Sequence, residues 1–438
     1  MKVDLLERII REAGKMGADE VVAGLYSSRS VRAEVEHNEV KRAVQNVNEA
    51  FRVTVIVGKR IASAYTTVVS EEEALKAVED AVRMAKASKP NEYWSGLPEP
   101  KKLPNVKGLY DERVAGLMAG DVVEMAWGMV EAAVGYDSRV VTEGIIESSV
   151  TYRAIATSSG FLGEERGTVI WGYAICVAKE AGEVGSFSFA TDEGRSLDVD
   201  FESVGRRAAK LAVETLGAKP VEPFKGTLIM DYDVVAQVLW ALSMAYTADN
   251  VWKGSSPLKG KIGQQVLHES LTIKDAGDMD GGFNSSRFDA EGSPRRTTVV
   301  FERGVLKNYI SNTYVANILG LEATGNAASL LTSAPTNTVV SPGDIDEEEL
   351  IGEVKRGVYV RRFSGDMRFQ DGVVSGVAKQ AFYVENGELV HPVVGCMISA
   401  NLYEMLRNVS GVGRKVEKRF GAYVPMIRVE DVAFISKR

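Results

Sequence analysis

A proline-rich stretch near residue 100 is the strongest constraint on how this chain can fold. Proline lacks the backbone N–H that helices and sheet interiors need, so the stretch interrupts any regular element. We expect a linker here, and it holds Pro90, Pro98, Pro100 and Pro104. A second boundary lies between Leu216 and Phe224, where Pro220 and Pro223 recur. The predicted domains are residues 1–88, 105–217 and 224–438.

Hydrophobic periodicity predicts an α+β unit before the linker. Apolar residues at helical spacing from Leu5 to Met16 indicate an opening helix that Gly17 can terminate. A capping box at Ser70 and Glu73 begins a second amphipathic helix. Between the two helices, β-branched and alternating residues predict short strands: Val21–Tyr26, Ser30–Glu36, Lys41–Gln45, Phe51–Val57 and Arg60–Thr67, with turns at His37-Asn38 and Gly58-Lys59.

The middle block is rich in strand signals. Helices are expected from about Asp111 to Ala133 and from Asp198 to Thr215. The runs between them are rich in β-branched and aromatic residues and are punctuated by glycine. They predict strands at Val140–Ser158, Gly167–Ala178 and Gly185–Ala190.

Charge and cysteine content exclude several classes of protein. The net charge of −8 disfavours direct nucleic-acid binding, which needs a clustered basic face. Cys176 and Cys396 are too few for a disulfide framework, and we expect both to be reduced core thiols. The chain begins without a hydrophobic signal core, and no apolar run approaches the roughly 18 residues of a membrane helix. We therefore expect a cytoplasmic protein that does not cross a membrane.

The segment from Asp231 to Gly263 has the pattern of a buried helix that leads into a Gly/Ser-rich loop. Asp231 and Asp233 are two candidate N-caps. Apolar side chains follow at helical spacing: Val235, Val238, Leu239, Leu242 and Tyr246. The loop reads Lys253-Gly254-Ser255-Ser256. After the loop we expect a strand-rich region, and further sequence motifs occur from residue 281 onward.

These motifs, taken together and in order, resemble the TldD/PmbA (TldE) family. The helix and its Lys-Gly-Ser-Ser loop are followed by FDAEGSP at 288–294, ATGNA at 323–327 and PTNTVVSPGD at 335–344. FYVENGELVHPV at 382–393 is similar to the family's late hairpin, and Asn386-Gly387 suits its tight turn. The resemblance is dense in the third block and looser in the first. It includes six motif residues of unproven role: Asp289, Glu291, Gly292, Thr324, Gly325 and Asn326.

The resemblance also implies that this chain lacks the family's metal site. In the TldD branch the equivalent helix carries His-Glu-x-x-x-His before the loop, and those positions fall here on Leu239, Trp240 and Met244. None of the three can supply a zinc-ligating nitrogen or a carboxylate base. TldD-type enzymes are also expected to recruit a cysteine near the C-terminus, but residues 397–438 contain none. We expect apolar bulk to fill the former site and the helix to pack as core or as a subunit interface, with Trp240 as an anchor.

The function that the resemblance implies is that of a non-catalytic TldE/PmbA-type subunit, a pseudo-peptidase, in a TldD/TldE metalloprotease complex that processes or degrades unfolded peptides. This chain then binds no cofactor, and zinc belongs to its partner, a TldD-type zinc peptidase. The implied assembly is a heterodimer, and an isolated chain can form a homodimer. The implied fold is α+β, with a mixed N-terminal domain, a β-rich middle region and a larger C-terminal domain of curved antiparallel sheet with buried helices.

Two alternatives stay open. One is an autonomous peptidase with an unrecognised site, and the other is a standalone interaction protein such as a modulator of DNA gyrase. Common catalytic motifs do not favour the first: His268-Glu269 has no second histidine at metalloprotease spacing, and Gly254 to Lys261 has the wrong glycine spacing for a phosphate loop. No Gly-x-Ser-x-Gly elbow with a matching histidine occurs.

Overall fold

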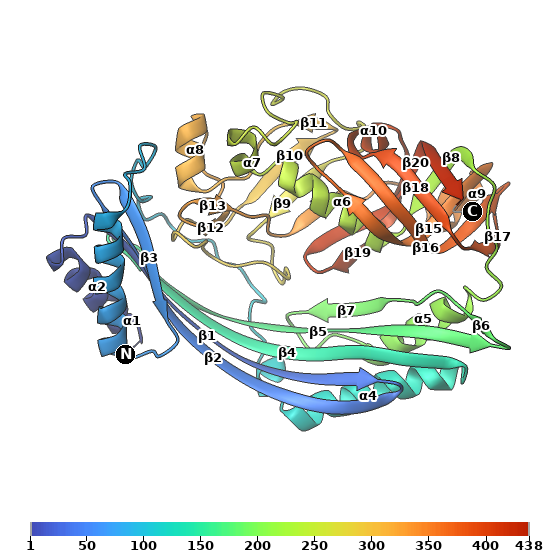
Figure 1. The fold of residues 1–438 in the computed structure, drawn as a ribbon, viewed down its shortest axis with the longest axis horizontal. Helices are drawn as coiled ribbons and strands as arrows, with labels where there is room; N and C mark the ends of the chain where they lie inside the picture. The colour runs from blue at the N-terminus through green and yellow to red at the C-terminus, as the bar shows by residue number, and fades with distance from the viewer. Residues whose placement is uncertain (1, 437–438) are drawn as a thin grey trace.

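The computed structural model describes residues 2–436, and its first half builds one long, curved antiparallel sheet (Figure 1). The strand order is β3-β2-β1-β4-β5-β6, and β7 pairs with β5. The strands are β1 Glu20–Glu36, β2 Glu39–Val57, β3 Arg60–Thr66, β4 Val140–Thr157, β5 Leu162–Glu180, β6 Glu183–Val184 and β7 Ala190–Gly194. Because β1 pairs with β2 on one side and β4 on the other, the sheet joins chain segments from both sides of the proline-rich linker.

The strands of this sheet are longer than the sequence predicts. Val21–Tyr26 and Ser30–Glu36 belong to one strand, β1, because hydrogen bonding to both neighbours continues through the polar residues between them. The predicted turns are confirmed: His37 and Asn38 have φ of 53° and 65°, and Gly58 and Lys59 have φ of 54° and 64°. The prediction of a strand at Gly185–Ala190 is wrong. That segment runs irregularly until β7 begins, since Ser188 bonds to the backbone of Cys176 through its side chain as well as its N–H.

Two pairs of helices cover the same face of the sheet at its opposite ends (Figure 1). Inward-facing residues of β1 alternate along the strand, as a period of two requires: Val21, Ala23 and Leu25 at one end, Val31, Ala33 and Val35 at the other. The helices are α1 Lys2–Lys15 and α2 Glu71–Ala87 at the first end, and α4 Ala119–Tyr136 and α5 Phe201–Val213 at the second. Ser70 caps α2 by accepting a hydrogen bond from the Glu73 N–H, as predicted.

The single helix predicted from Asp111 to Ala133 is instead two. Asp111 caps the short helix α3, Glu112–Gly116, and Leu117 and Met118 are extended before α4 begins. The break lets Val114 and Leu117 enter the core beneath β4 while α4 starts on a new axis. Helical propensity does not reveal such a break, because it depends on packing against the sheet.

The second half of the chain forms a curled sheet that is mostly antiparallel. Its order is β11-β10-β9-β14-β20-β18-β16-β15-β8, and an extra β20–β8 pairing closes part of it into a barrel. The β15–β8 and β14–β20 pairs are parallel. The strands are β8 Phe224–Met230, β9 Ile273–Ala276, β10 Thr297–Glu302, β11 Val305–Leu306, β14 Thr338–Val340, β15 Arg356–Met367, β16 Val373–Glu385, β17 Glu388–Val393, β18 Cys396–Asn401, β19 Val409–Arg419 and β20 Ala422–Ser436, with a separate pair β12 Ala327–Ser329 and β13 Thr332–Ser333.

Helices are inserted into and around this second sheet, so the architecture is α+β as predicted. They are α6 Tyr232–Ala245, α7 Ala248–Trp252, α8 Thr313–Leu319, α9 Glu347–Gly352 and α10 Leu402–Arg407. The predicted turn at Asn386-Gly387 is confirmed by positive φ at both residues. Among residues 2–436, no helix is both long and apolar enough to cross a membrane.

Candidate functional site

Helix α6 begins at a strong cap and packs one face into the core of the second half. The Asp231 carboxylate accepts the N–H of Tyr232 at 2.6 Å and the hydroxyl of Tyr359 at 2.5 Å. Of the two candidate caps, Asp231 is therefore the one used. Burial raises the pKa of the Asp231 carboxyl, and the hydrogen bond from Tyr359 opposes that rise. Apolar side chains of the helix pack against β15 and β20: Val235, Val238, Leu239 and Leu242.

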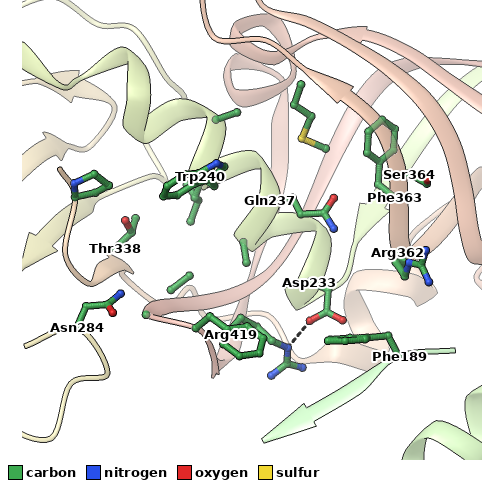
Figure 2. A pocket seen from close by; sticks show the side chains of 18 of the residues that line it. Phe189, Asp233, Gln237, Trp240, Asn284, Thr338, Arg362, Phe363, Ser364 and Arg419 are labelled. Carbon is green, nitrogen blue, oxygen red and sulfur yellow. Dashed lines mark hydrogen bonds and ion pairs between the residues drawn. The ribbon is translucent and has the colours of Figure 1, made fainter. Parts of the chain in front are cut away.

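An open groove of about 820 Å³ lies against the other face of α6 (Figure 2). Helix α6 contributes Asp233, Gln237 and Trp240, and β15 contributes the run from Arg362 to Gly365. The turn between β19 and β20, the loop at Asn284 and the segment that leads into β14 at Thr338 close other sides. Phe189, just before β7, comes from the first half of the chain. The groove therefore lies where the two halves of the molecule meet.

Of the three former metal-site positions, Leu239 and Trp240 border this groove and Met244 does not. Leu239 is 1% exposed and belongs to the core, whereas Trp240 is 63% exposed and projects into the groove (Figure 2). Met244 is half-buried and does not line the groove. Positions five apart on a regular helix lie about 140° apart, so Leu239 and Met244 diverge. Leu239 is a buried apolar side chain, and the groove beside it stays open.

The side chains that line the groove do not fit a zinc ion. Asp233 is their only carboxylate, and its Oδ1 lies 2.5 Å from Nε of Arg419 in an ion pair. No histidine, cysteine or glutamate lines the groove. Across residues 2–436, no three His, Cys, Asp or Glu side chains are grouped as a metal site would need. Burial raises the pKa of Asp233, while the charge of Arg419 acts in the opposite direction.

The histidines and cysteines lie elsewhere. His37 lies in the β1–β2 turn, His268 bonds Ser270 through Nδ1 at 2.9 Å, and His391 stacks on Tyr383. Both cysteines are buried core thiols, and burial raises the pKa of each to about 11. A thiol with so high a pKa is a poor nucleophile at neutral pH.

Two of the six family-motif residues, Asp289 and Glu291, are buried acceptors that organise a loop. Asp289 accepts the backbone N–H groups of Glu291, Ser293 and Ala327, each at 3.0 Å. Glu291 accepts both the N–H and the hydroxyl of Thr313, at 2.9 and 2.5 Å. Burial raises the pKa of Asp289, and burial together with the charge of Asp289 raises the pKa of Glu291 to about 8.

Thr324 and Asn326 extend the same network toward β9. The Thr324 hydroxyl donates to Oδ1 of Asn326 at 2.7 Å, and Nδ2 of Asn326 donates to Asp275 at 2.8 Å. Asp275 also accepts the N–H and hydroxyl of Thr336, both at 2.7 Å, and Thr336 lines the groove. None of the six motif residues is itself a lining residue.

Gly292 and Gly325 allow this network to close. Both have positive φ, at 85° and 74°. A Cβ at Gly292 would lie 2.5 Å from the ring of Phe161, and one at Gly325 would lie 2.2 Å from the carbonyl oxygen of Pro294. Only glycine combines that backbone conformation with such close approach.

The groove residues missed by sequence reasoning come from segments far apart in the chain. Arg419 meets Asp233 across 186 positions, and Phe420 and Gly421 beside it have φ of 51° and 90° in the β19–β20 turn. Phe-Gly after a polar strand is a turn signal that could have located this corner. For Phe189 no comparable signal exists, because its place depends on the irregular approach to β7.

Comparison with known proteins identifies the class of protein that this fold and groove define. Three consecutive family models match: PmbA/TldA metallopeptidase domain 1 at residues 21–85, the central domain at 119–216 and the C-terminal domain at 224–436. The class is thus that of the three-domain metallopeptidase-like proteins. The chain belongs to the PmbA/TldD family.

Individual relatives agree with that assignment. The chain is 33% identical over 294 residues to a metalloprotease of Methanothermobacter thermautotrophicus, a match that covers 62% of this chain and 63% of the relative. The crystal structure of TldE from Thermococcus kodakarensis superposes with a TM-score of 0.92 at 26% identity, over 99% of this chain and all of that one. A candidate modulator of DNA gyrase from Thermotoga maritima gives a TM-score of 0.90 at 25% identity, with the same coverage. These similarities support a role connected with peptide hydrolysis.

Proposed function

We propose that this chain is a non-catalytic TldE/PmbA-type subunit that pairs with a TldD-type zinc peptidase and holds unfolded peptides for cleavage. The observation that carries the proposal is the environment of α6. The positions at which the TldD branch places its ligands are a core leucine, an exposed tryptophan and a methionine outside the groove. The one carboxylate in the groove is engaged by Arg419.

The groove nevertheless suits an extended peptide, because a strand edge runs along it. Strand β8 pairs with β15 from Gly357 to Val360 and then turns into α6 at Asp231, whose N–H bonds the carbonyl of Val360 at 3.0 Å. Within residues 2–436, no strand pairs with residues 361–367 on that side of β15. Consecutive residues Arg362 to Gly365 line the groove, so it follows the edge of the strand and not one face.

An open strand edge binds an extended peptide through main-chain hydrogen bonds, with pockets for alternate side chains. Trp240 offers exposed apolar surface beside that edge, and Gln237 and Ser364 offer polar groups (Figure 2). Such a surface fits many sequences, since the backbone supplies most of the contacts. This is the property that a subunit handling unfolded chains needs.

The test is reconstitution with a partner that carries His-Glu-x-x-x-His. The two chains are purified separately and together, and cleavage of an unstructured casein fragment is followed by mass spectrometry. We expect cleavage in the mixture and none by this chain alone. A partner variant with its first motif histidine changed to alanine is the matched control and should leave the mixture inactive. Chelator-sensitive cleavage by this chain alone would overturn the proposal.

A further inference from the structure

A second cavity, of about 240 Å³, lies beside the groove between the long sheet and the second half of the chain. Four arginines line it: Arg153 and Arg166 on β4 and β5, Arg195 just after β7, and Arg295 just before β10. Glu165 is the only carboxylate among its lining residues. We call this space the arginine cavity.

Arg195 and Arg295 are held in place by neutral groups. Arg195 donates to the carbonyl oxygens of Gly282, Phe283 and Ser285 at 2.7 to 2.9 Å. Arg295 donates to the carbonyl of Gly325 at 2.7 Å and to the Ser286 hydroxyl at 3.2 Å. Within the described chain, neither guanidinium has a carboxylate within the 4.0 Å of an ion pair. Burial lowers the pKa of both arginines, which reflects the unfavourable desolvation of their charge.

The carboxylates nearby are already engaged. Glu165 pairs with Arg153 at 2.6 Å and accepts the N–H of Arg287 at 3.0 Å. The negative charges of Asp275 and Asp289 also attract the guanidinium of Arg295. Their oxygens, however, already accept the hydrogen bonds of the loop network described above. The lining of the cavity is therefore left with more positive than negative charge. The charges of Arg195 and Arg295 are compensated only by neutral acceptors, so an anion that entered the cavity would be attracted to them.

Donors for that anion are available. Within residues 2–436, Nη2 of Arg295 has no hydrogen-bond partner, and the exposed Arg166 has neither a hydrogen bond nor an ion pair. The Thr151 and Ser285 side chains lie in the same lining. The planar fork of a guanidinium matches the two oxygens of a carboxylate or of a phosphate.

Asn284 connects this cavity to the groove, because it lines both. We propose that the arginine cavity binds the C-terminal carboxylate of a peptide whose extended chain lies in the groove along β15. The inference rests on the proposed function and deepens it: the substrates are peptides with a free C-terminus, which this subunit anchors. Inorganic phosphate shares the chemistry and is expected to compete for the anchor.

The test compares two forms of one eight-residue peptide of Ala, Ser and Thr with fluorescein at its N-terminus. One form ends in a free carboxylate and the other in an amide, and binding is measured by fluorescence anisotropy to this chain alone and to its mixture with the zinc peptidase. We expect the free acid to bind about tenfold or more tightly, as a charge-assisted hydrogen-bonded pair allows. Added phosphate should weaken only the acid.

Variants assign the effect to the cavity. Arg166→Gln and Arg295→Gln should each bring the affinity of the acid toward that of the amide while leaving the amide unchanged. Arg83→Gln, an exposed position on α2, is the matched control and should change neither. Because Arg295 also supports its loop, circular dichroism confirms folding, and Arg166→Gln keeps the test valid if Arg295→Gln does not fold.

The outcomes separate the two proposals. Equal affinities for acid and amide, with Trp240→Ala weakening both, would overturn the carboxylate anchor and leave peptide holding by the groove intact. Competition by phosphate without discrimination between the peptides would also overturn it, since the cavity would then serve a free anion. Failure of both peptides to bind in the mixture would overturn both proposals.

Discussion

Two regions of the second half differ in how they relate to the family: helix α6 lacks the metal-binding motif of the TldD branch, whereas the loop network keeps the family's motif residues. Around α6, Trp240 and Gln237 face an open groove. In the loop network, Asp289, Glu291 and Asn326 are buried and bonded to one another's backbone or to neighbouring loops. The network shapes the wall of the groove through Thr336, and the groove offers the surface for a ligand.

The difference shows that the presence of a family motif does not by itself establish the chemical role of its residues. From the sequence alone, Asp289 and Glu291 of the FDAEGSP motif could be interpreted as catalytic carboxylates. Their raised pKa values would favour that interpretation. The hydrogen bonds instead account for both side chains as loop supports. At α6, in contrast, the change of residue type removes the ligands while the surrounding groove persists.

The largest change in stability is expected for Asp289→Ala, in the loop network. This change leaves three buried N–H groups without their acceptor, and we expect the free energy of unfolding to fall by about 3–5 kcal/mol. Urea denaturation followed by circular dichroism measures it. Asp278→Ala, which removes one exposed hydrogen bond to Thr297, is the control and should cost less than about 1 kcal/mol. Equal losses in the two variants would show that the network is not a buried support.

The second prediction concerns Leu239→His, which restores one of the former ligands. The imidazole would enter the core where Leu239 is 1% exposed, so we expect a loss of about 2–4 kcal/mol in unfolding free energy and no gain of zinc. Leu239→Met keeps the volume and should cost less than about 1.5 kcal/mol. Stoichiometric zinc in the histidine variant, measured by plasma mass spectrometry, would contradict the view that the groove beside this position lacks the ligands of a zinc site.

The third prediction is a pH dependence of stability that originates in the network. The pKa of Glu291 in the folded chain is about 8, against an ordinary 4.5, so the folded state keeps its proton while the unfolded state releases it. The stability contributed by this group is therefore complete below pH 4.5 and decreases as the pH rises toward 8.

Glu291→Gln removes that titration and keeps an acceptor for Thr313. We expect the variant to gain about 3–4 kcal/mol relative to the parent chain between pH 5 and pH 8, as shown by unfolding curves across that range. Thr332, whose hydroxyl bonds that of Ser329 at 2.7 Å at an exposed turn away from Glu291, provides a control: Thr332→Ala should leave the pH profile parallel to that of the parent. If the stability of Glu291→Gln changed with pH in parallel with that of the parent, the titration of Glu291 would not contribute to the pH dependence of stability.

The smallest effect on stability is expected for Trp240→Ala. Because the side chain is 63% exposed, its loss should change the free energy of unfolding by less than about 1 kcal/mol. Its effect on binding should be larger, with the affinity for an extended peptide falling about tenfold, as for a large aromatic in a binding groove. Titration calorimetry measures the second quantity. A large loss of stability together with unchanged peptide binding would show that Trp240 supports the fold and does not bind the ligand.

Much of the fold could be predicted from local pattern. Capping and helical spacing located α2 and α6, and paired turn residues located the β1–β2, β2–β3 and β16–β17 hairpins. The length of β1 could not be predicted, because its polar centre is held by strands on both sides. The break before α4 likewise depends on packing beneath β4.

The candidate site was predictable only in part, for a physical reason. The absence of ligands at Leu239, Trp240 and Met244 can be read from their residue types. The open edge of β15 cannot, since it exists because Asp231 ends β8 early and redirects the chain into α6. The ion pair of Asp233 with Arg419 and the four arginines of the cavity arise from segments that only the folded chain brings together.

The most direct test of the central claim is native mass spectrometry of the reconstituted complex, with zinc counted per assembly. The account predicts one zinc for each partner chain, none on this chain when it is isolated, and loss of both zinc and cleavage when the partner's first motif histidine becomes alanine. A zinc ion that stays bound to this chain by itself, or cleavage that survives the partner variant, would contradict it.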